Sequence, residues 1–588
     1  METPFVLLDD ATSSDARLLH FSQPFQVITA HRPSEVSTAL SAVEKALAAG
    51  WHVAGWMAYE LGYALEPRLA ALLPASNSHP LCWFGVFDAP REIARADLSG
   101  EGRAYAGRLQ HEWNRETYRE RFKRVHDYIE AGDIYQANVS FRSRFHFAGD
   151  PLALFLQLHD RAAAAHGAFV DDGTRQILSL SPELFFAIDG GGKITARPMK
   201  GTWARGTDEL SDARAKAALA ASAKDRAENL MIVDLLRNDI GRLALIGSVA
   251  VPELYSVETY PTLHTMVSTV TAQLKPAVRA AAIVRALFPC GSITGAPKIR
   301  AMEVIRELES SLRGVYCGAI GFFAPDGAAK FNVAIRTITI EGHNGELGVG
   351  GAVVQDSRAD AEYDECLLKA RYFETARRPI ALIETLRYDG VFVRLERHLE
   401  RLRKSAAFLG LPFDRTAAAA ALGRVVVGAA GPLRVRLTLD EDGVFACEAA
   451  SLGGSHTQWR FALSPYRVDS RDVLLRHKTS WREFHDDEQS RLSRVAGSDE
   501  VVFQNERGEV CEGSRTNIFV SRGGKLVTPP LSSGLLDGIL RRELIETGEC
   551  IEAVLTPADL TGDVFLGNSL RGLIRAQLLR SSLLFDGG

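Results

Sequence analysis

The sequence lacks long apolar runs, an excess of basic charge and a cysteine framework. Its 588 residues carry 68 Lys and Arg against 73 Asp and Glu, so no general positive field favours nucleic acid. No stretch approaches the roughly eighteen apolar residues of a membrane span, and the acidic start METPFVLLDDATSSDAR is unlike a signal peptide. The seven cysteines show no CxxC spacing, which argues against disulfides and a zinc site. These absences predict a cytoplasmic enzyme that binds neither nucleic acid nor membrane.

The length of the chain predicts several domains, because one hydrophobic core rarely serves 588 residues. Apolar strands alternate with amphipathic helices from about residue 111 to 376. A new strand–turn–strand pattern follows in ALIETLRYDGVFV, where Asp389-Gly390 is a hairpin signal. No internal repeat is evident, so the two halves should differ in fold and chemistry. We therefore predict an α+β protein with parts at 1–110, 111–376 and 377–588.

Two predicted helices carry acidic stripes in the first half. In KDRAENLMIVDLLRND, Asp225 and Glu228 are three residues apart, and in ADAEYDECLLKA, Glu362, Glu365 and Lys369 share one face. Carboxylates on two helices suit Mg²⁺, a hard cation that prefers oxygen ligands. The alternative is a pair of solvated helix faces with ordinary pairing between Glu365 and Lys369.

Ordered motifs from about residue 115 to 375 resemble the chorismate-utilising enzymes, and within them the branch that forms aminodeoxychorismate. The resemblance implies an αββα sandwich-type fold that binds chorismate. The motifs are IEAGDIYQANVS (129–140), SPELFF (181–186), RPMKGT (197–202), ENLMIVDLLRNDIGR (228–242), FPCGSITGAPKIRAME (288–303), GVYCGAIGFF (314–323), FNVAIRT (331–337) and GVGGAVVQDSRADAEYDECLLKA (348–370).

Lys200 in RPMKGT distinguishes the aminodeoxychorismate-forming branch from the anthranilate-forming branch, whose members typically have alanine at this position. The resemblance implies that Lys200 attacks ring carbon 2 of chorismate while Glu183 protonates the departing 4-hydroxyl group, after which ammonia adds at carbon 4. An ordinary lysine is neutral at pH 7 in about one molecule in a few thousand, so the site must lower the pKa of Lys200.

The resemblance also implies the groups that bind substrate and metal. Gln136 aligns with a residue of the amine-using relatives. No cysteine lies in a G-x-C-x-G turn, so ammonia should arrive free or from a separate glutamine amidotransferase subunit. For His264, a core role remains open. The implied chorismate-binding residues are Gln136, His264, Ser292, Thr294, Tyr316, Arg336, Gly350, Gly351 and Lys369, and the implied Mg²⁺ ligands are Glu228, Glu362 and Glu365.

The chain from about residue 379 resembles the class IV aminotransferase-like enzymes that use pyridoxal 5'-phosphate. The resemblance implies the two-subdomain fold type IV of D-amino acid aminotransferase, with Lys478 binding the cofactor and Glu512 facing its pyridine nitrogen. Leu540 departs from the family, in which many members have threonine there. The motifs are HLERL (398–402), HKTSWREF (477–484), EVCEGSRTNIFV (509–520), GLLDGILRREL (534–544) and GNSLRGL (567–573), and the implied phosphate-binding residues are Arg401, Gly538, Ile539, Leu540, Asn568 and Ser569.

Together the two resemblances predict a bifunctional enzyme of folate biosynthesis. The first half would aminate chorismate to 4-amino-4-deoxychorismate, and the second would act as aminodeoxychorismate lyase, eliminating pyruvate to give 4-aminobenzoate. One alternative joins anthranilate synthesis to an amino-acid transaminase. Another retains one half only as a docking or regulatory module. A homodimer through the C-terminal half is a further expectation.

Overall fold

The computed structural model describes residues 3–9, 17–74, 79–98, 100, 102–162, 164–259, 263–454 and 458–579. Two compact units make up the chain. The first comprises residues 1–99, 108–145 and 155–376, and the second comprises residues 100–107, 146–154 and 377–588. Two short segments from the N-terminal half of the sequence therefore belong to the second unit.

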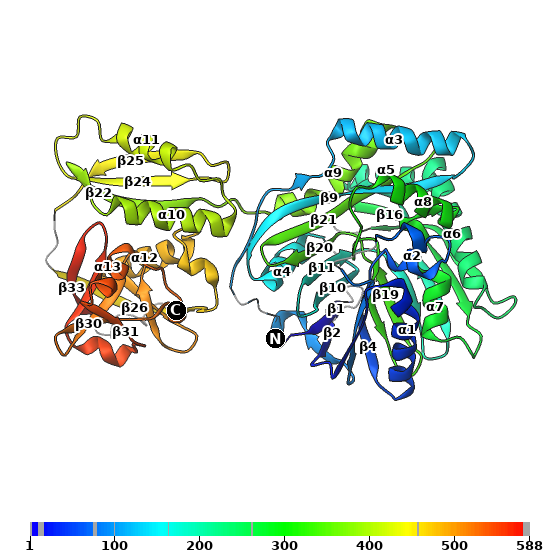
Figure 1. The fold of residues 1–588 in the computed structure, drawn as a ribbon, viewed down its shortest axis with the longest axis horizontal. Coiled ribbons are helices and arrows are strands. Elements are labelled where there is room, and N and C mark those ends of the chain that lie inside the picture. Colours follow the sequence, from blue (N-terminus) through cyan, green and yellow to red (C-terminus); the bar gives the residue numbers. More distant parts are fainter. Residues whose placement is uncertain are drawn as a thin grey trace. The chain divides into compact units, whose positions relative to one another are not determined.

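The first unit contains two large sheets of mainly antiparallel strands (Figure 1). One sheet has the spatial order β17 (Gly295–Ala296), β9 (Gln136–Gly149), β21 (Asn344–Val353), β20 (Thr337–Glu341), β11 (Gln176–Ser181), β10 (His166–Asp171), β1 (Phe5–Asp9), β2 (Arg17–Ser22) and β6 (Arg91–Ala94), with β7 (Ala104–Ala106) and β8 (Gln110–His111) paired to β9. The end of β9 and its partner β7 lie in the segments assigned to the second unit.

The other sheet places the lysine motif at its edge. Its order is β14 (Met199–Ala204), β16 (Leu263–Gln273), β13 (Lys193–Arg197), β12 (Leu184–Ile188), β19 (Ala329–Val333), β18 (Ala319–Phe323), β4 (His52–Met57), β5 (Cys82–Phe87) and β3 (Gln26–Ala30), with β15 (Ala250–Thr259) paired to β16. The run SPELFFAI thus supplies strand β12, as its apolar pattern predicts.

Apolar side chains between the two sheets form one core, which includes Trp56, Trp83 and Ile320. A larger core lies between the second sheet and its covering helices. Helices on both outer faces give the predicted αββα sandwich (Figure 1). The helices are α1 (Pro33–Ala48), α2 (Leu61–Leu65), α3 (Arg115–Glu130), α4 (Pro151–Ala162), α5 (Glu209–Ala221), α6 (Ala223–Gly241), α7 (Ala280–Leu287), α8 (Lys298–Leu308) and α9 (Ala359–Ala376).

The acidic stripes lie on helices α6 and α9, as their periodicity predicts. Helix α6 begins after Ser222, whose hydroxyl accepts a hydrogen bond from the Asp225 N–H, a common N-terminal cap. Helix α9 packs against β21, and α6 packs against β16. Both helices therefore extend beside strands that carry site residues.

The second unit has two subdomains. The smaller contains the sheet β23 (Val391–Phe392), β22 (Leu382–Asp389), β24 (Leu433–Leu439) and β25 (Phe445–Ser451), with helices α10 (Leu395–Leu409) and α11 (Arg415–Val425). The larger contains the sheet β28 (Val510–Gly513), β27 (Glu500–Asn505), β26 (Gln458–Val468), β33 (Gly572–Leu578), β32 (Val564–Asn568), β29 (Asn517–Arg522), β30 (Lys525–Thr528) and β31 (Cys550–Glu552), with helices α12 (Glu483–Ala496) and α13 (Ile539–Glu546).

Gly390 makes the predicted hairpin turn between β22 and β23, and its φ of +73° is one that glycine adopts without strain. Within the described parts of the chain, no helix combines the length and apolarity needed to cross a membrane.

Candidate active sites

Lys200 lies in β14, where it is partly buried beside the short helical turn Gly291–Ile293. Its Nζ donates a hydrogen bond to the carbonyl oxygen of Ser292 at 3.1 Å. Burial lowers the pKa of Lys200, although the nearby carboxylates of Glu228 and Glu183 oppose this shift. The surroundings therefore increase the neutral, nucleophilic fraction of this amine.

Glu183 lies immediately before β12 and is 3% exposed. Burial raises the pKa of its carboxyl group to about 7, against the lowering effect of a Ser292 hydrogen bond and the Lys200 charge. Its Oε1 has no hydrogen-bond partner within the described residues. A buried carboxyl group that holds a proton near neutral pH, with one oxygen unpaired, is suited to act as a general acid.

Gln136 and Asn138 connect β9 to the same loop. Gln136 is fully buried, and its Nε2 donates to Asn138 Oδ1 at 3.2 Å, while its Oε1 has no partner within the described chain. Asn138 Nδ2 in turn donates to the Ser292 carbonyl at 2.5 Å. The oxygen that accepts from Lys200 is thus also held by Asn138, a residue that the motif analysis did not single out.

The two predicted glycines of β21 bring backbone close to a second lysine. A Cβ on Gly350 would lie 2.5 Å from the Val139 carbonyl oxygen, so no side chain fits there. Lys369 Nζ donates to the Gly350 carbonyl at 3.0 Å and pairs with Glu365 at 2.8 Å. Gly351 faces this group, since a Cβ placed on it would be 3.8 Å from Lys369 Nζ.

Two of the predicted metal ligands, Glu228 of α6 and Glu362 of α9, lie on either side of Lys224. Lys224 Nζ is 3.9 Å from a carboxylate oxygen of both Glu228 and Glu362. Burial raises the pKa of both carboxyl groups. No set of three His, Cys, Asp or Glu side chains in the described chain lies close enough to hold a metal ion. The arrangement suits a cation at this place, but a divalent ion would have to displace the Lys224 ammonium group.

Four other predicted residues have partners of their own. His264 is 1% exposed, and its ring nitrogens lie 2.9 Å from Asp212 Oδ1 and 3.0 Å from Thr259 Oγ1. Thr294 Oγ1 donates to the Cys290 carbonyl at 2.8 Å. The Arg142 guanidinium lies 5.1 Å from the centroid of the Tyr316 ring. The backbone carbonyl of Arg336 accepts a hydrogen bond from the Leu180 N–H at 3.0 Å, and Arg336 has a positive φ of +49°.

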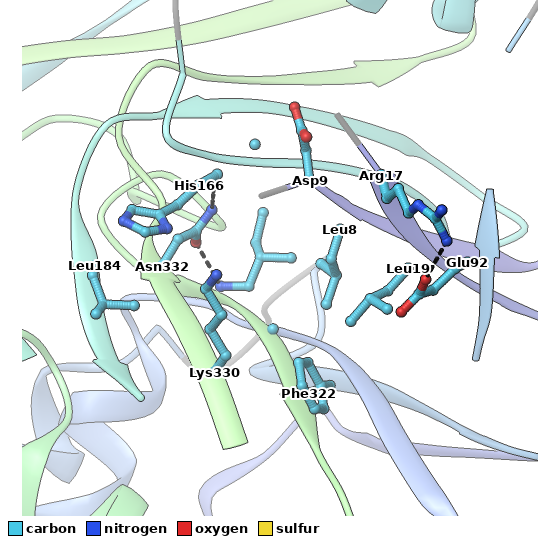
Figure 2. A pocket seen from close by; sticks show the side chains of 13 residues that line it. Leu8, Asp9, Arg17, Leu19, Glu92, His166, Leu184, Phe322, Lys330 and Asn332 are labelled. Carbon is cyan, nitrogen blue, oxygen red and sulfur yellow. Dashed lines mark hydrogen bonds and ion pairs between the residues drawn. The ribbon is translucent and has the colours of Figure 1, made fainter. Parts of the chain in front are cut away.

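A cavity of about 550 Å³ opens between the two sheets of the first unit (Figure 2). Leu8 and Asp9 line it from one sheet, and Phe322, Lys330 and Asn332 line it from the other. None of the predicted substrate or metal residues lines this cavity. It is therefore separate from the group around Lys200.

Lys478 is the predicted reactive lysine of the second unit. Its Nζ donates to Thr385 Oγ1 of β22 at 3.3 Å. Burial lowers the pKa of Lys478 to about 7, and the Arg401 charge adds to that effect. The lowered pKa therefore increases the neutral fraction of the amine near pH 7, as a nucleophile or a general base requires.

Glu512, in β28, is joined through Asn517 to the turn 536–538, which contains the predicted phosphate-binding residue Gly538. Burial raises the pKa of Glu512 to about 8. Asn517 Nδ2 lies 3.4 Å from Glu512 Oε2 and donates to the Leu536 carbonyl at 3.0 Å. A Cβ on Gly538 would lie 1.8 Å from Asn517 Oδ1, so a side chain there would displace the Asn517 amide group.

Gly538 is the N-terminal cap of α13, which begins at Ile539 as predicted. Free N–H groups at the start of a helix can bind phosphate. Leu540 is 5% exposed and packs in an apolar cluster with Phe519 and Leu544. The family's hydroxyl contact at this position is therefore replaced by core packing.

Arg401 and Ser569 are joined by two buried residues, Glu384 and His398, to which the sequence analysis assigned no role. Arg401 donates to the Glu384 carboxylate through Nε at 2.9 Å and Nη2 at 2.6 Å. His398 Nδ1 is 2.6 Å from Glu384 Oε2, and His398 Nε2 is 2.8 Å from Ser569 Oγ. Asn568 Oδ1 accepts from the N–H of Leu570 at 3.1 Å, which closes the turn around Ser569.

The donors and acceptors of the second unit fit pyridoxal phosphate. A lysine with a lowered pKa, a buried carboxyl group, an arginine and a glycine-capped helix are the groups that this cofactor's aldehyde, ring nitrogen and phosphate require. Hydrogen bonds connect Arg401 to the turn before Gly538, since Arg401 Nη1 lies 3.4 Å from the Asp537 carbonyl. Arg401 thus links the buried Glu384 carboxylate to the turn before Gly538.

The chain belongs to the chorismate binding enzyme family, whose model matches residues 3–375. Residues 381–579 match the amino-transferase class IV family, which implies pyridoxal phosphate as the cofactor. Both predicted family resemblances and the predicted fold classes are thus confirmed.

Aminodeoxychorismate synthase component 1 of Escherichia coli is 48% identical over 258 residues, which are 44% of this chain and 56% of that relative. Anthranilate synthase component 1 of Cereibacter sphaeroides is 37% identical over 295 residues, which are 50% of this chain and 59% of that relative. This chain thus spans little more than half the length of these relatives.

The solved structure of anthranilate synthase component I from Streptococcus pneumoniae has a TM-score of 0.52 at 23% identity. The matched region covers 63% of this chain and 92% of the Streptococcus pneumoniae chain. This likeness bears on the fold alone.

Proposed function

We propose that the chain makes 4-aminobenzoate in two steps. The first unit replaces the 4-hydroxyl group of chorismate with an amino group and releases water, giving 4-amino-4-deoxychorismate. The second unit divides that product into 4-aminobenzoate and pyruvate. The observation that carries the proposal is the contact of Lys200 with the Ser292 carbonyl beside Glu183, whose raised pKa favours its protonated form, because anthranilate formation needs no lysine there.

In the first unit, neutral Lys200 attacks ring carbon 2 of chorismate, and the ring double bonds shift as the 4-hydroxyl group leaves with the proton of Glu183. Ammonia then adds at carbon 4, and the lysine leaves from carbon 2. Lys369 and Arg336 supply cations for the two substrate carboxylates. The pKa of Lys200 is lowered and that of Glu183 is raised, and these opposite shifts support the roles of nucleophile and acid.

In the second unit, bound pyridoxal phosphate supplies an electron sink. Lys478 would hold the cofactor, and its free amine would remove the proton from carbon 4 of the substrate. Glu512 would keep the pyridine nitrogen of the cofactor protonated. Elimination of pyruvate follows because it creates an aromatic ring, a driving force that a transaminase substrate lacks.

The proposal extends to partners and to a metal. Glu228, Glu362 and Glu365 would bind Mg²⁺ after their carboxylates move closer together and Lys224 is displaced, and the cation would offset the charge of the substrate carboxylates. Ammonia would come from a separate glutamine amidotransferase subunit, the chain would work in the cytoplasm, and the second unit would form a homodimer.

The proposed function is tested by giving the purified chain chorismate, Mg²⁺ and an ammonium salt and identifying the aromatic product by chromatography. 4-Aminobenzoate with one equivalent of pyruvate is expected. Anthranilate as the main product would refute the proposal and favour the rival synthase. A halt at 4-amino-4-deoxychorismate would refute only the lyase half.

Once the amine of Lys200 is neutral, the rate of amination should fall as pH rises above the raised Glu183 pKa of about 7, at a constant concentration of unprotonated ammonia. Glu183 is protonated below its raised pKa. Above that pKa it lacks the proton that it must donate, so the rate should drop about tenfold per pH unit on this limb. Glu183→Gln should be slower by roughly 10²–10⁴-fold and lack the limb. A limb that persists in this variant would assign it to another group.

Removing a proposed metal ligand should raise the Mg²⁺ requirement of amination. Glu228→Ala should increase the Mg²⁺ concentration for half-maximal rate by more than about 10- to 100-fold, the scale seen for groups that only support metal ligands. Asp234→Ala, an exposed residue of the same helix paired with Arg237, is the matched control and should leave the requirement unchanged. Full activity of the unaltered chain in excess chelator would rule out the metal.

A further inference from the structure

The buried chain Glu384–His398–Ser569 restricts where hydrogens can lie at the proposed phosphate site. Burial alone would raise the pKa of Glu384, but the Arg401 and His398 charges and hydrogen bonds lower it to about 2. Glu384 is therefore ionised and can only accept hydrogen bonds. At 2.6 Å from Glu384 Oε2, His398 Nδ1 must carry a hydrogen, because two acceptors would repel each other at that distance.

The position of the Ser569 hydrogen then depends on the charge of His398. If His398 is neutral, its Nε2 is an acceptor, and Ser569, 2.8 Å away, must donate to it. The Ser569 hydroxyl then presents lone pairs to any phosphate beside it. If His398 gains a proton, Nε2 donates to Ser569 Oγ, and the hydroxyl hydrogen is free to donate to a phosphate oxygen. Only the charged state is complementary to an anion.

The groups that surround His398 favour this second state once an anion is bound. Glu384 from β22 attracts the imidazolium, while Arg401 and Lys478 oppose it. Arg394, which lies 3.4 Å from the Ser569 carbonyl, is neutralised by Glu543 of α13 at 2.6 Å. In the absence of an anion, burial is the largest influence and lowers the pKa of His398. A phosphate dianion adds negative charge one hydroxyl away and reverses the balance.

We propose that His398 takes up one proton when the cofactor phosphate binds, and that Glu384 and His398 are positioning residues that turn the Ser569 hydroxyl into a phosphate donor. This inference rests on the cofactor site of the proposed function. The Ser569 donor offsets the hydroxyl contact that is lost at Leu540, whose side chain is in the core. Binding coupled to proton uptake weakens as pH rises through the raised pKa of the bound state.

The test is calorimetric titration of the full chain, freed of cofactor, with pyridoxine 5'-phosphate at pH 8. This ligand has the phosphate but no aldehyde, so it forms no covalent bond with Lys478, and its phosphate is already a dianion at that pH. Measurements in two buffers with different ionisation enthalpies give the number of protons taken up. His398→Gln removes the titrating ring, and Ser569→Ala removes the hydroxyl with little change in volume.

The unaltered chain should take up about one more proton than either variant, and between pH 7 and 9 its affinity should fall by up to about tenfold per unit more steeply than theirs. His485→Gln, which alters another buried histidine of the second unit, should behave like the unaltered chain. Equal proton uptake in the unaltered chain and in both variants would overturn the inference. Absence of any binding by the unaltered chain would instead refute the cofactor site and the lyase function.

Discussion

Lys478→Ala should stop the formation of 4-aminobenzoate while 4-amino-4-deoxychorismate accumulates. The variant keeps the first unit but loses both the covalent attachment point and the base with a pKa of about 7. Loss of such a base typically lowers the rate by about 10²–10⁴-fold, and loss of the covalent attachment should add to this effect. The visible absorption of the bound cofactor should also disappear, which spectrophotometry of the purified protein measures directly.

Lys404→Ala is the matched control, because Lys404 is an exposed lysine of α10 in the same unit. It should retain full lyase activity and cofactor absorption. If Lys478→Ala released pyruvate and 4-aminobenzoate at the original rate, the assignment of the second unit would be wrong. Supplying synthetic 4-amino-4-deoxychorismate keeps this result independent of the first unit.

Lys200→Ala should abolish most formation of 4-amino-4-deoxychorismate. Alanine cannot attack carbon 2, so the two-step substitution loses its first bond, and we expect a fall of roughly 10³-fold or more. Because alanine is typical of the anthranilate-forming branch, a trace of product aminated at carbon 2 is expected instead. Product chromatography and mass spectrometry of the protein after rapid quenching measure both the loss and the missing covalent adduct.

Lys216→Ala serves as the control for this variant, since Lys216 is an exposed lysine of the neighbouring helix α5. It should form product at the normal rate. Normal product at a normal rate from Lys200→Ala would exclude the covalent route. A first unit that aminated carbon 4 without Lys200 would then require direct addition of ammonia.

Local patterns were sufficient to predict the elements that carry the sites. The 3.6-residue spacing of apolar residues predicts α6 and α9, and a glycine before ILRREL predicts the start of α13. These features depend on residues near one another in sequence. The fold of each half, in contrast, came from resemblance, because strand order across a sheet of eleven strands depends on pairings between distant segments.

The supporting residues could not be found in this way. Asn138 lies 154 positions from the Ser292 carbonyl that it holds, and His398 lies 171 positions from Ser569. One signal was available: Glu384 is an acidic residue within the apolar strand ALIETL, where it is 2% exposed. A charge on the inner face of a strand requires buried partners, which here are Arg401 and His398.

The segments 100–107 and 146–154 make the second unit discontinuous in sequence. Within it, Arg103 donates to Asp472 at 2.7 Å and to the Trp481 carbonyl at 2.9 Å, and Tyr105 packs in the core of the smaller subdomain. A gene that began at codon 377 would therefore express the second unit without two of its own segments. A fusion of residues 377–588 to another protein would therefore lack part of the second unit unless these eight- and nine-residue segments were supplied as well.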